Sequence, residues 1–218
     1  MVENMTRRQF LRATGVVVGG TLALGGIARC ASKVDDERAE VATPSTSYRG
    51  DGDVGKRVLV GYATRTGSTV GVAEAIGETL ATRGFGVDVK PLKERPSAEG
   101  YDAFVLGSAI NGAHWLPEAV EYVEANRAAL GAAPTAVFCV HAMNLGDDQK
   151  QRSKRLAYLE KVRPLVTPAD EGFFAGVGPS ADDTSLIARW AFKAFGGGVE
   201  GDGRDWDKIR GWARQAQV

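Results

Sequence analysis

The chain contains little cysteine and carries no net charge. Only two cysteines occur in its 218 residues. Cys30 closes an N-terminal apolar stretch and Cys139 falls in a predicted buried strand, so we expect no disulfide between them. Lysine plus arginine and aspartate plus glutamate both number 27, and this zero formal charge gives no electrostatic reason to expect a nucleic-acid partner. The sequence shows no internal repeat, and we expect no metal site.

Two common nucleotide-binding signatures are also missing after the first predicted strand. No Gly-Lys-Ser/Thr follows the glycine of this loop, which excludes a nucleotide-triphosphate loop, and no G-x-G-x-x-G is present, which excludes a dinucleotide fingerprint. The sequence has instead a strand–loop–helix run, VLVGYATRTGSTVGVAEAIGETL, from Val58 to Leu80. Its loop is rich in hydroxyl side chains, and its helical part carries apolar residues at helical spacing.

The loop of this run has the composition of a cradle for one phosphate. A helix N-terminus offers unsatisfied backbone N–H groups and the positive end of the helix dipole. Gly67 lets the backbone approach a ligand without a Cβ in the way. Arg65 is the only positively charged residue of this loop. The alternative is an ordinary turn whose hydroxyls cap the helix, although a cap needs only one hydroxyl. The predicted phosphate-binding residues are Thr64, Arg65, Thr66, Gly67, Ser68 and Thr69.

The pattern T-x-T-G-S-T after a first strand resembles that of the flavodoxin family. This resemblance implies flavin mononucleotide (FMN) as the cofactor, with its phosphate held by the loop.

The N-terminus has the pattern of a targeting segment. Arg7 and Arg8 precede a short glycine-containing apolar stretch, as in a twin-arginine export signal. The apolar stretch is shorter than the roughly 20 residues that a comfortable membrane span requires, although a retained membrane anchor is the alternative. We therefore expect a signal or anchor in residues 1–30, use of the twin-arginine export machinery, and a location outside the cytoplasm. That location is the outer face of the cytoplasmic membrane, the periplasm or the extracellular space.

Cys30 stands where a lipoprotein carries its lipidated cysteine, but the preceding Arg29 does not fit that motif. Cleavage by the ordinary signal peptidase near Ser32 is the competing interpretation, and the sequence leaves both open. Residues 31–55 are polar, lack an apolar period and are predicted to form a flexible linker. Residues 56–218 then form the globular domain, which is long enough for one hydrophobic core.

The domain alternates predicted strands and helices, which indicates an α/β fold with helices on both faces of a parallel sheet. The expected strands are Arg57–Ala63, Gly86–Leu92, Ala103–Ile110, Thr135–Val140 and Phe173–Val177. The expected helices are Val70–Arg83, one from Pro117 to Gly131, Asp147–Val162, Thr184–Phe195 and Trp206–Gln215 with Asp205 as its cap. We expect a flavodoxin-like, doubly wound five-stranded sheet of order 2-1-3-4-5.

In such a sheet the ligand binds beyond the carboxyl ends of the strands, where the strand order reverses. The loops after the first, third and fourth predicted strands should therefore converge. In the second of these loops Trp115 or His114 could stack on a flavin ring, although packing of Trp115 under the next helix is the alternative. The further cofactor-binding candidates are Ser108, Ala109, Asn111, Gly112, Trp115, His141 and Asn144. Asn144 could instead cap the next helix, and His141 is the one weak candidate for proton transfer.

Longer stretches resemble a particular branch of this family. The segments YATRTGST, GSAINGAHWLPEAVEYV, FFAGVG and GDGRDWDKIRGWARQ are similar in order and spacing to the flavodoxin-type menaquinone-dependent protoporphyrinogen IX dehydrogenases. The similarity runs from about Arg57 to Gln217. It implies an FMN-dependent oxidoreductase that passes electrons from a small reduced donor to a quinone, close to a membrane surface. The alternative is an exported flavodoxin-like electron carrier with no substrate of its own.

Overall fold

The computed structural model describes residues 41–49, 55–178 and 198–218. They belong to one compact unit, Val41–Val218. The predicted N-terminal signal, most of the predicted linker and the expected helix Thr184–Phe195 lie outside the described residues.

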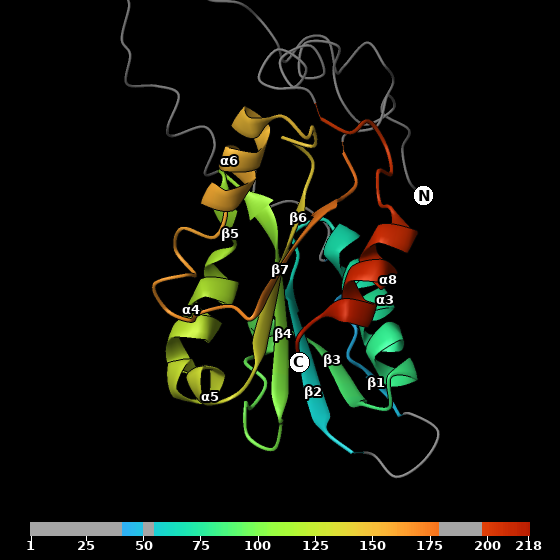
Figure 1. The fold of residues 1–218 in the computed structure, drawn as a ribbon, viewed down its shortest axis with the longest axis vertical. Helices are drawn as coiled ribbons and strands as arrows, with labels where there is room; N and C mark the ends of the chain where they lie inside the picture. Colours follow the sequence, from blue (N-terminus) through green and yellow to red (C-terminus); the bar gives the residue numbers. More distant parts are fainter. Residues whose placement is uncertain (1–40, 50–54, 179–197) are drawn as a thin grey trace, which may run out of the picture. The chain divides into compact units, whose positions relative to one another are not determined.

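The described strands form one mainly parallel sheet (Figure 1). They are β1 (Thr46–Tyr48), β2 (Arg57–Ala63), β3 (Gly86–Pro91), β4 (Ala103–Asn111), β5 (His114–Trp115), β6 (Thr135–His141) and β7 (Asp170–Ala175). Their order is β1-β3-β2-β4-β6-β7, with β5 paired to β4 outside this path. The central part, β3-β2-β4-β6-β7, has the predicted order 2-1-3-4-5, so the predicted α/β fold class is confirmed.

Helices cover both faces of the sheet (Figure 1). The described helices are α3 (Ser68–Thr82), the short 3₁₀ helix η1 (Leu92–Glu94), α4 (Pro117–Ala125), α5 (Arg127–Ala132), α6 (Gln149–Ala157) and α8 (Trp206–Gln215). Helices α3 and α8 lie side by side on one face, and α4, α5 and α6 lie on the other. From β2 the chain adds β3 on one side and then β4, β6 and β7 on the other, so the strand order reverses between β2 and β4.

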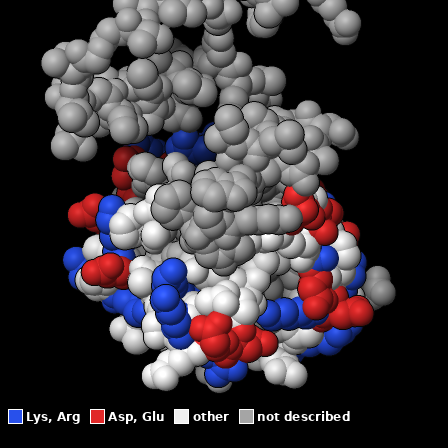
Figure 2. All heavy atoms as spheres, turned by 90° about the horizontal axis from the view of Figure 1, so that it is seen from above, with Lys and Arg blue, Asp and Glu red and all other residues white. Residues whose placement is uncertain are grey.

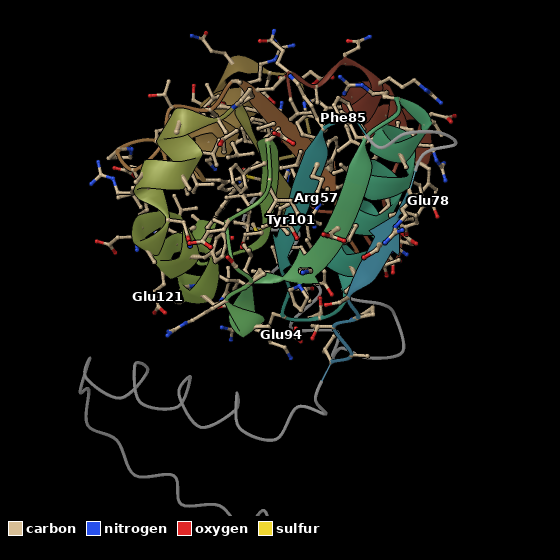
Figure 3. All side chains as sticks on the ribbon, turned by 90° about the horizontal axis from the view of Figure 1, so that it is seen from below. Arg57, Glu78, Phe85, Glu94, Tyr101 and Glu121 are labelled. Atoms are coloured by element: carbon tan, nitrogen blue, oxygen red, sulfur yellow. The ribbon has the colours of Figure 1, made fainter. Side chains whose placement is uncertain are left out.

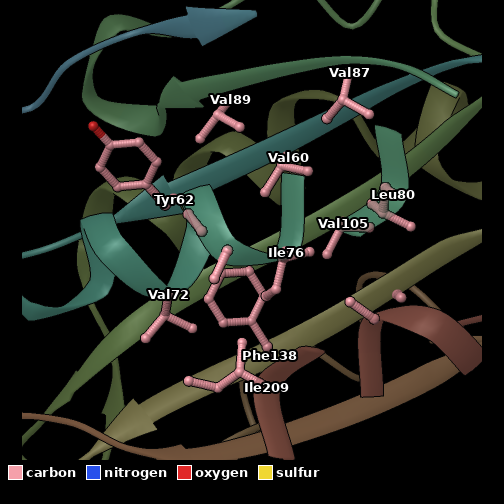
Figure 4. Close-up of a cluster of buried hydrophobic side chains, with 14 of the residues drawn as sticks. Val60, Tyr62, Val72, Ile76, Leu80, Val87, Val89, Val105, Phe138 and Ile209 are labelled. Carbon is pink, nitrogen blue, oxygen red and sulfur yellow. The ribbon is translucent and has the colours of Figure 1, made fainter. Parts of the chain in front are cut away.

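Strand β2 supplies both halves of the core because its side chains alternate between the two faces of the sheet. Val58, Val60 and Tyr62 are fully buried and pack in the cluster under α3 and α8 (Figure 4). Leu59 and Ala63 belong to the opposite cluster, under α4 and the segment after α6. A strand that is covered on both faces requires the continuous apolar run that this sequence has.

Strand β1 lies within the predicted linker, so the prediction of an unstructured segment is wrong at these three residues. The strand pairs antiparallel with β3, and its central Ser47 donates a 2.6 Å hydrogen bond to Asp88. Arg57 and Tyr101 also donate to Asp88, at 2.8 and 2.7 Å, and the Arg57 guanidinium lies over the Tyr101 ring (Figure 3). Burial raises the pKa of Asp88, but these hydrogen bonds outweigh burial and hold the pKa below its usual value. A three-residue strand carries too weak a pattern to be seen in the sequence.

Two helices are shorter than their patterns predict. The expected helix from Pro117 to Gly131 is broken at Asn126, whose φ of −110° is not helical. Its side-chain amide donates to the carbonyl of Tyr122 instead, a competition that asparagine often enters. The expected helix Asp147–Val162 extends only over α6, and the residues after it form turns. By contrast, α8 has the predicted bounds, and the Asp205 carboxylate accepts from the N–H of Lys208 as expected for a cap.

Close packing between β4 and β6 gives a test of the core. A Cβ on Gly107 would lie 2.1 Å from the Phe138 ring, both inside the sheet core. We expect Gly107→Ala to reduce the free energy of unfolding by about 1–3 kcal/mol, because a rigid ring must move. The matched control is Gly131→Ala in α5, where a Cβ meets nothing within 4 Å and should not destabilise. Urea denaturation of both variants would measure this, and equal stability would contradict the packing argument.

Candidate flavin site

The registers of the parallel strands bring several loops to one edge of the sheet. Ala63 pairs with Ser108, Ser108 with Cys139, and Cys139 with Phe173. Since these strands all run in one direction, the loops that follow them start at the same carboxyl edge. Figure 2 looks down on this edge, whose described rim carries basic and acidic side chains close to one another, with no large patch of one sign.

The loop after β2 forms a cradle at the start of α3. Gly67 has a φ of +88° and precedes the first residue of the helix, a backbone conformation that favours glycine. Its N–H donates a 3.0 Å hydrogen bond to the Thr64 hydroxyl oxygen, which fixes the shape of the loop. Thr66 is exposed, and Ser68 is half-buried. The N–H group of Val70 donates to the Gly67 carbonyl at 3.1 Å, whereas those of Ser68 and Thr69 have no acceptor within the helix, so an anion placed here would meet two backbone donors.

Thr69 gives a second reason to place a polar ligand here. Its side chain is fully buried, and its hydroxyl has no hydrogen-bond partner in the part of the chain that the structure describes. Buried hydroxyls in proteins are almost always hydrogen-bonded. The loop geometry, the hydroxyls and this unpaired group together fit a phosphate.

A cleft of about 520 Å³ lies between the loops that follow β4 and β6. This volume is within the usual range for a cofactor or substrate pocket. The described residues that line it are Ile110, Asn111, Gly112, Ala113, His141, Ala142, Met143, Asn144, Lys154, Ala157 and Tyr158. Most of these are apolar or small, and Lys154 is the only charged side chain among them. A flat ring with a few polar edge atoms fits such walls.

A tight turn forms one wall of this cleft. Ile110 and Asn111 pair with β5 across Gly112 and Ala113, which both have positive φ values, +58° and +66°. Two consecutive residues of positive φ make the turn that suits a two-residue hairpin. The left-handed conformation is costly for alanine, so the hairpin that shapes the cleft overrides the local preference of Ala113.

His141 lies at the opposite wall and is held neutral. Its Nδ1 is 2.6 Å from the carbonyl oxygen of Met143, so this nitrogen carries the proton and donates. Burial lowers the pKa of His141 to about 4, although the bond to Met143 raises it somewhat. The Nε2 atom is then a buried acceptor, with no partner among the residues described. At neutral pH this side chain can accept a hydrogen bond, and it has no second proton to give.

Asn144 is at the cleft, but it is not the cap of the next helix. Asp148 caps α6 instead, accepting from the N–H of Gln151. Asn144 has a φ of +60°, and its amide donates a 2.7 Å hydrogen bond to the Tyr158 hydroxyl. Arg155 donates to the Asn144 carbonyl. This network fixes the loop that faces the cleft.

Comparison with known protein families assigns the chain to one of them. A model of the flavodoxin domain matches residues 59–178, which is more than half of the sequence. The chain belongs to the flavodoxin domain family. Membership implies a flavin cofactor and electron-transfer chemistry. No curated protein matches the chain.

Several solved structures are similar to this flavodoxin domain. A flavodoxin from the domain Archaea is 15% identical, with 73% of this chain and 94% of that chain covered and a TM-score of 0.45. Flavodoxin 2 from Bacillus cereus is 16% identical, with coverages of 72% and 94% and a TM-score of 0.46. The rubredoxin oxygen:oxidoreductase of Desulfovibrio gigas is 12% identical, with coverages of 74% and 37% and a TM-score of 0.39.

Two predicted cofactor contacts are instead parts of the core. Trp115 is 3% exposed, and its indole N–H donates to the Cys139 sulfur at 3.1 Å, so the ring has no open face for stacking. Ser108 is fully buried. Its hydroxyl donates to the Ala109 carbonyl and accepts from the N–H of Leu116. An aromatic and a hydroxyl next to a glycine-rich turn look alike in sequence whether they brace the turn or touch a ligand. Asn111 and Gly112 do line the cleft.

The sequence analysis missed one component of this edge, the segment of residues 198–204. Its backbone bonds to the ends of two strands: the N–H of Val199 donates to Ala142, and that of Gly203 donates to Gly176. A Cβ on Gly176 would in turn lie 3.3 Å from the Ser68 hydroxyl. The segment therefore lies close to the cradle, and its signal in the sequence was the stretch GDGRDWDKIRGWARQ that carries the family resemblance.

The described residues hold neither a metal-binding cluster nor a membrane-spanning helix. They contain no group of three or more histidine, cysteine, aspartate or glutamate side chains that could hold a metal. None of the helices described is long and apolar enough to cross a membrane.

The buried histidine makes stability depend on pH. An unfolded chain protonates His141 near pH 6.5, whereas the folded chain resists protonation down to about pH 4. The contribution of neutral His141 to the free energy of unfolding is fully present above about pH 6.5 and is lost as the pH falls toward 4. We expect wild type to lose up to about 3 kcal/mol more than His141→Gln between pH 7 and 4. Denaturant unfolding at several pH values measures this difference. If NMR shows that the His141 ring of the folded protein titrates with a midpoint near pH 6.5, the prediction is wrong.

Proposed function

We propose that this flavodoxin domain binds FMN, with the phosphate in the cradle after β2 and the ring in the cleft between the loops that follow β4 and β6. The observation that supports this most is the pairing of a single-phosphate cradle with an apolar cleft at the same sheet edge. The loop after β2 lacks the G-x-G-x-x-G pattern of dinucleotide sites, which favours FMN over FAD.

The described residues would then have distinct roles. Backbone N–H groups of Ser68 and Thr69 and the hydroxyls of Thr64 and Thr66 would hold the phosphate. Asn111 and the Gly112 backbone would border the ring from one side. His141 Nε2 would accept a hydrogen bond from a donor at the ring edge, and its buried position would satisfy that atom.

We further propose an oxidoreductase that passes electrons from a small reduced donor to a quinone. Bound FMN supplies the electron chemistry, and the protein supplies binding, orientation and exclusion of water. The apolar walls of the cleft suit a quinone or a planar donor. Lys154 is positioned to attract an anionic donor, a class that includes the porphyrinogens implied by the sequence resemblance.

The path of the chain before β2 supports a membrane as the source of quinone. Because β1 runs antiparallel to β3, the residues before Thr46 extend toward the carboxyl edge of the sheet. Tyr62 donates to the Pro44 carbonyl at 2.7 Å, and a Cβ on Gly67 would lie 3.3 Å from Val41. The chain thus enters the domain beside the cradle. We propose that the twin-arginine segment exports the protein and that the membrane it reaches faces this edge.

Cofactor choice is the first test. We expect the purified protein to bind FMN and to leave FAD and nicotinamide cofactors unbound. The double variant Thr66→Ala/Ser68→Ala should weaken FMN binding, since each lost hydrogen bond to a charged group is worth about 1.5–3 kcal/mol. Thr82→Ala, at the far end of α3, is the control. Titration followed by flavin fluorescence measures the affinities, and a protein that remains colourless with FMN would overturn the proposal.

Electron acceptor choice is the second test. We expect the reduced holoprotein to be reoxidised faster by menaquinone or ubiquinone analogues than by dioxygen in stopped-flow measurements. Ala157 lines the cleft, whereas the nearby exposed Ser153 does not. Ala157→Phe should therefore slow reoxidation by quinone, and Ser153→Phe should not. If quinones do not accelerate reoxidation, the electron-carrier function replaces the oxidoreductase.

A further inference from the structure

The segment of residues 198–204 places a cation beside the phosphate cradle. Besides its bonds to Ala142 and Gly176, this segment accepts at the Gly201 carbonyl from the N–H of Gly178, at 2.8 Å. Backbone bonds therefore hold it to the ends of β6 and β7 immediately before α8 begins. Its last residue, Arg204, faces away from those strands toward α3, as its contacts show.

Two neighbours fix the conformation of Arg204. Its Nε and Nη2 atoms donate to the two carboxylate oxygens of Asp202, at 2.8 and 2.6 Å. The guanidinium carbon lies 4.7 Å from the centre of the Trp206 ring. This fork uses two of the three guanidinium nitrogens. The Nη1 atom is not part of it, and the side chain is already ordered before any ligand binds.

Nη1 lies against the first turn of α3. A Cβ built on Gly71, the fourth residue of that helix, would be 3.1 Å from it. Cα–Cβ bonds in a helix tilt toward its N-terminus, so the position that Nη1 approaches lies over the turn that begins at Ser68. That turn contains the N–H groups of the cradle. Glycine at position 71 is what lets the guanidinium come this close.

We infer that Arg204 is a phosphate-binding residue of this domain, one that favours phosphorylated flavin over the unphosphorylated form. The inference rests on the proposed FMN function. Hydroxyls and N–H groups at the cradle recognise the shape of a phosphate, and Arg65 is the cation of that loop. The Asp202 carboxylate offsets part of the Arg204 charge, and the Nη1 hydrogens outside that fork can donate to a phosphate oxygen. Riboflavin has the same ring without the phosphate, so Arg204 should matter for FMN alone.

The competing explanation is that Arg204 only braces α8 against α3 through Asp202 and Trp206. The chain offers a matched control, because Arg210 also stacks on Trp206, at 6.0 Å, but from within α8. Removing the charge of Arg210 changes the same aromatic contact, and no contact links Arg210 to Gly71.

The experiment compares the affinities of Arg204→Gln, Arg210→Gln and wild type for FMN and for riboflavin, from quenching of flavin fluorescence. We expect Arg204→Gln to weaken FMN binding by about tenfold or more and to leave riboflavin binding within about twofold, with Arg210→Gln changing neither. An equal loss for both ligands, or no loss for FMN, would overturn the inference. A wild type that binds neither flavin would overturn the FMN function itself.

A second variant covers the case in which Arg204→Gln does not fold. Gly71→Ala adds a Cβ 3.1 Å from Nη1, so the guanidinium must shift by a few tenths of an ångström, while alanine favours the helix. It should also weaken FMN binding selectively. A folded Gly71→Ala protein whose FMN affinity equals that of wild type, at low salt as well as at ordinary salt concentration, would count against a charge contribution from Arg204.

Discussion

The burial of β2 on both faces is the constraint on which the rest of the structure depends. This strand pairs with β3 on one side and β4 on the other, and its alternating side chains enter both core clusters. Because the strand is central, its carboxyl end lies where the strand order reverses. The loop that follows it is therefore placed at the ligand edge by the packing of the core, and the chemistry of that loop can vary without affecting the fold.

The site combines a polar cradle with a cleft whose polar groups are held by internal bonds. Asn144 donates to Tyr158 and His141 Nδ1 donates to the Met143 carbonyl, which leaves His141 Nε2 as the buried polar atom of the cleft without a partner among the described residues. His141 illustrates the consequence. Its bond to Met143 fixes the tautomer, and burial keeps it uncharged, so it can orient a ligand by accepting a hydrogen bond.

The first described residues and the segment before α8 also converge on this edge. The residues before β1 pass Tyr62 and Gly67, and the segment before α8 contacts the loops after β6 and β7. Elements far apart in the sequence thus surround the cradle.

The sequence by itself determined the fold and the cradle, since both depend on local patterns. Apolar runs define buried strands, and a glycine with several hydroxyls before a helix defines an anion site. The bounds of α8 and its cap at Asp205 were predictable for the same reason. Only the tertiary structure decided that Trp115 and Ser108 serve the core, that residues 46–48 form an edge strand, and that Arg204 reaches α3. Each of these depends on which distant residue lies opposite, such as Cys139, Asp88 or Gly71, and local sequence carries no record of that partner.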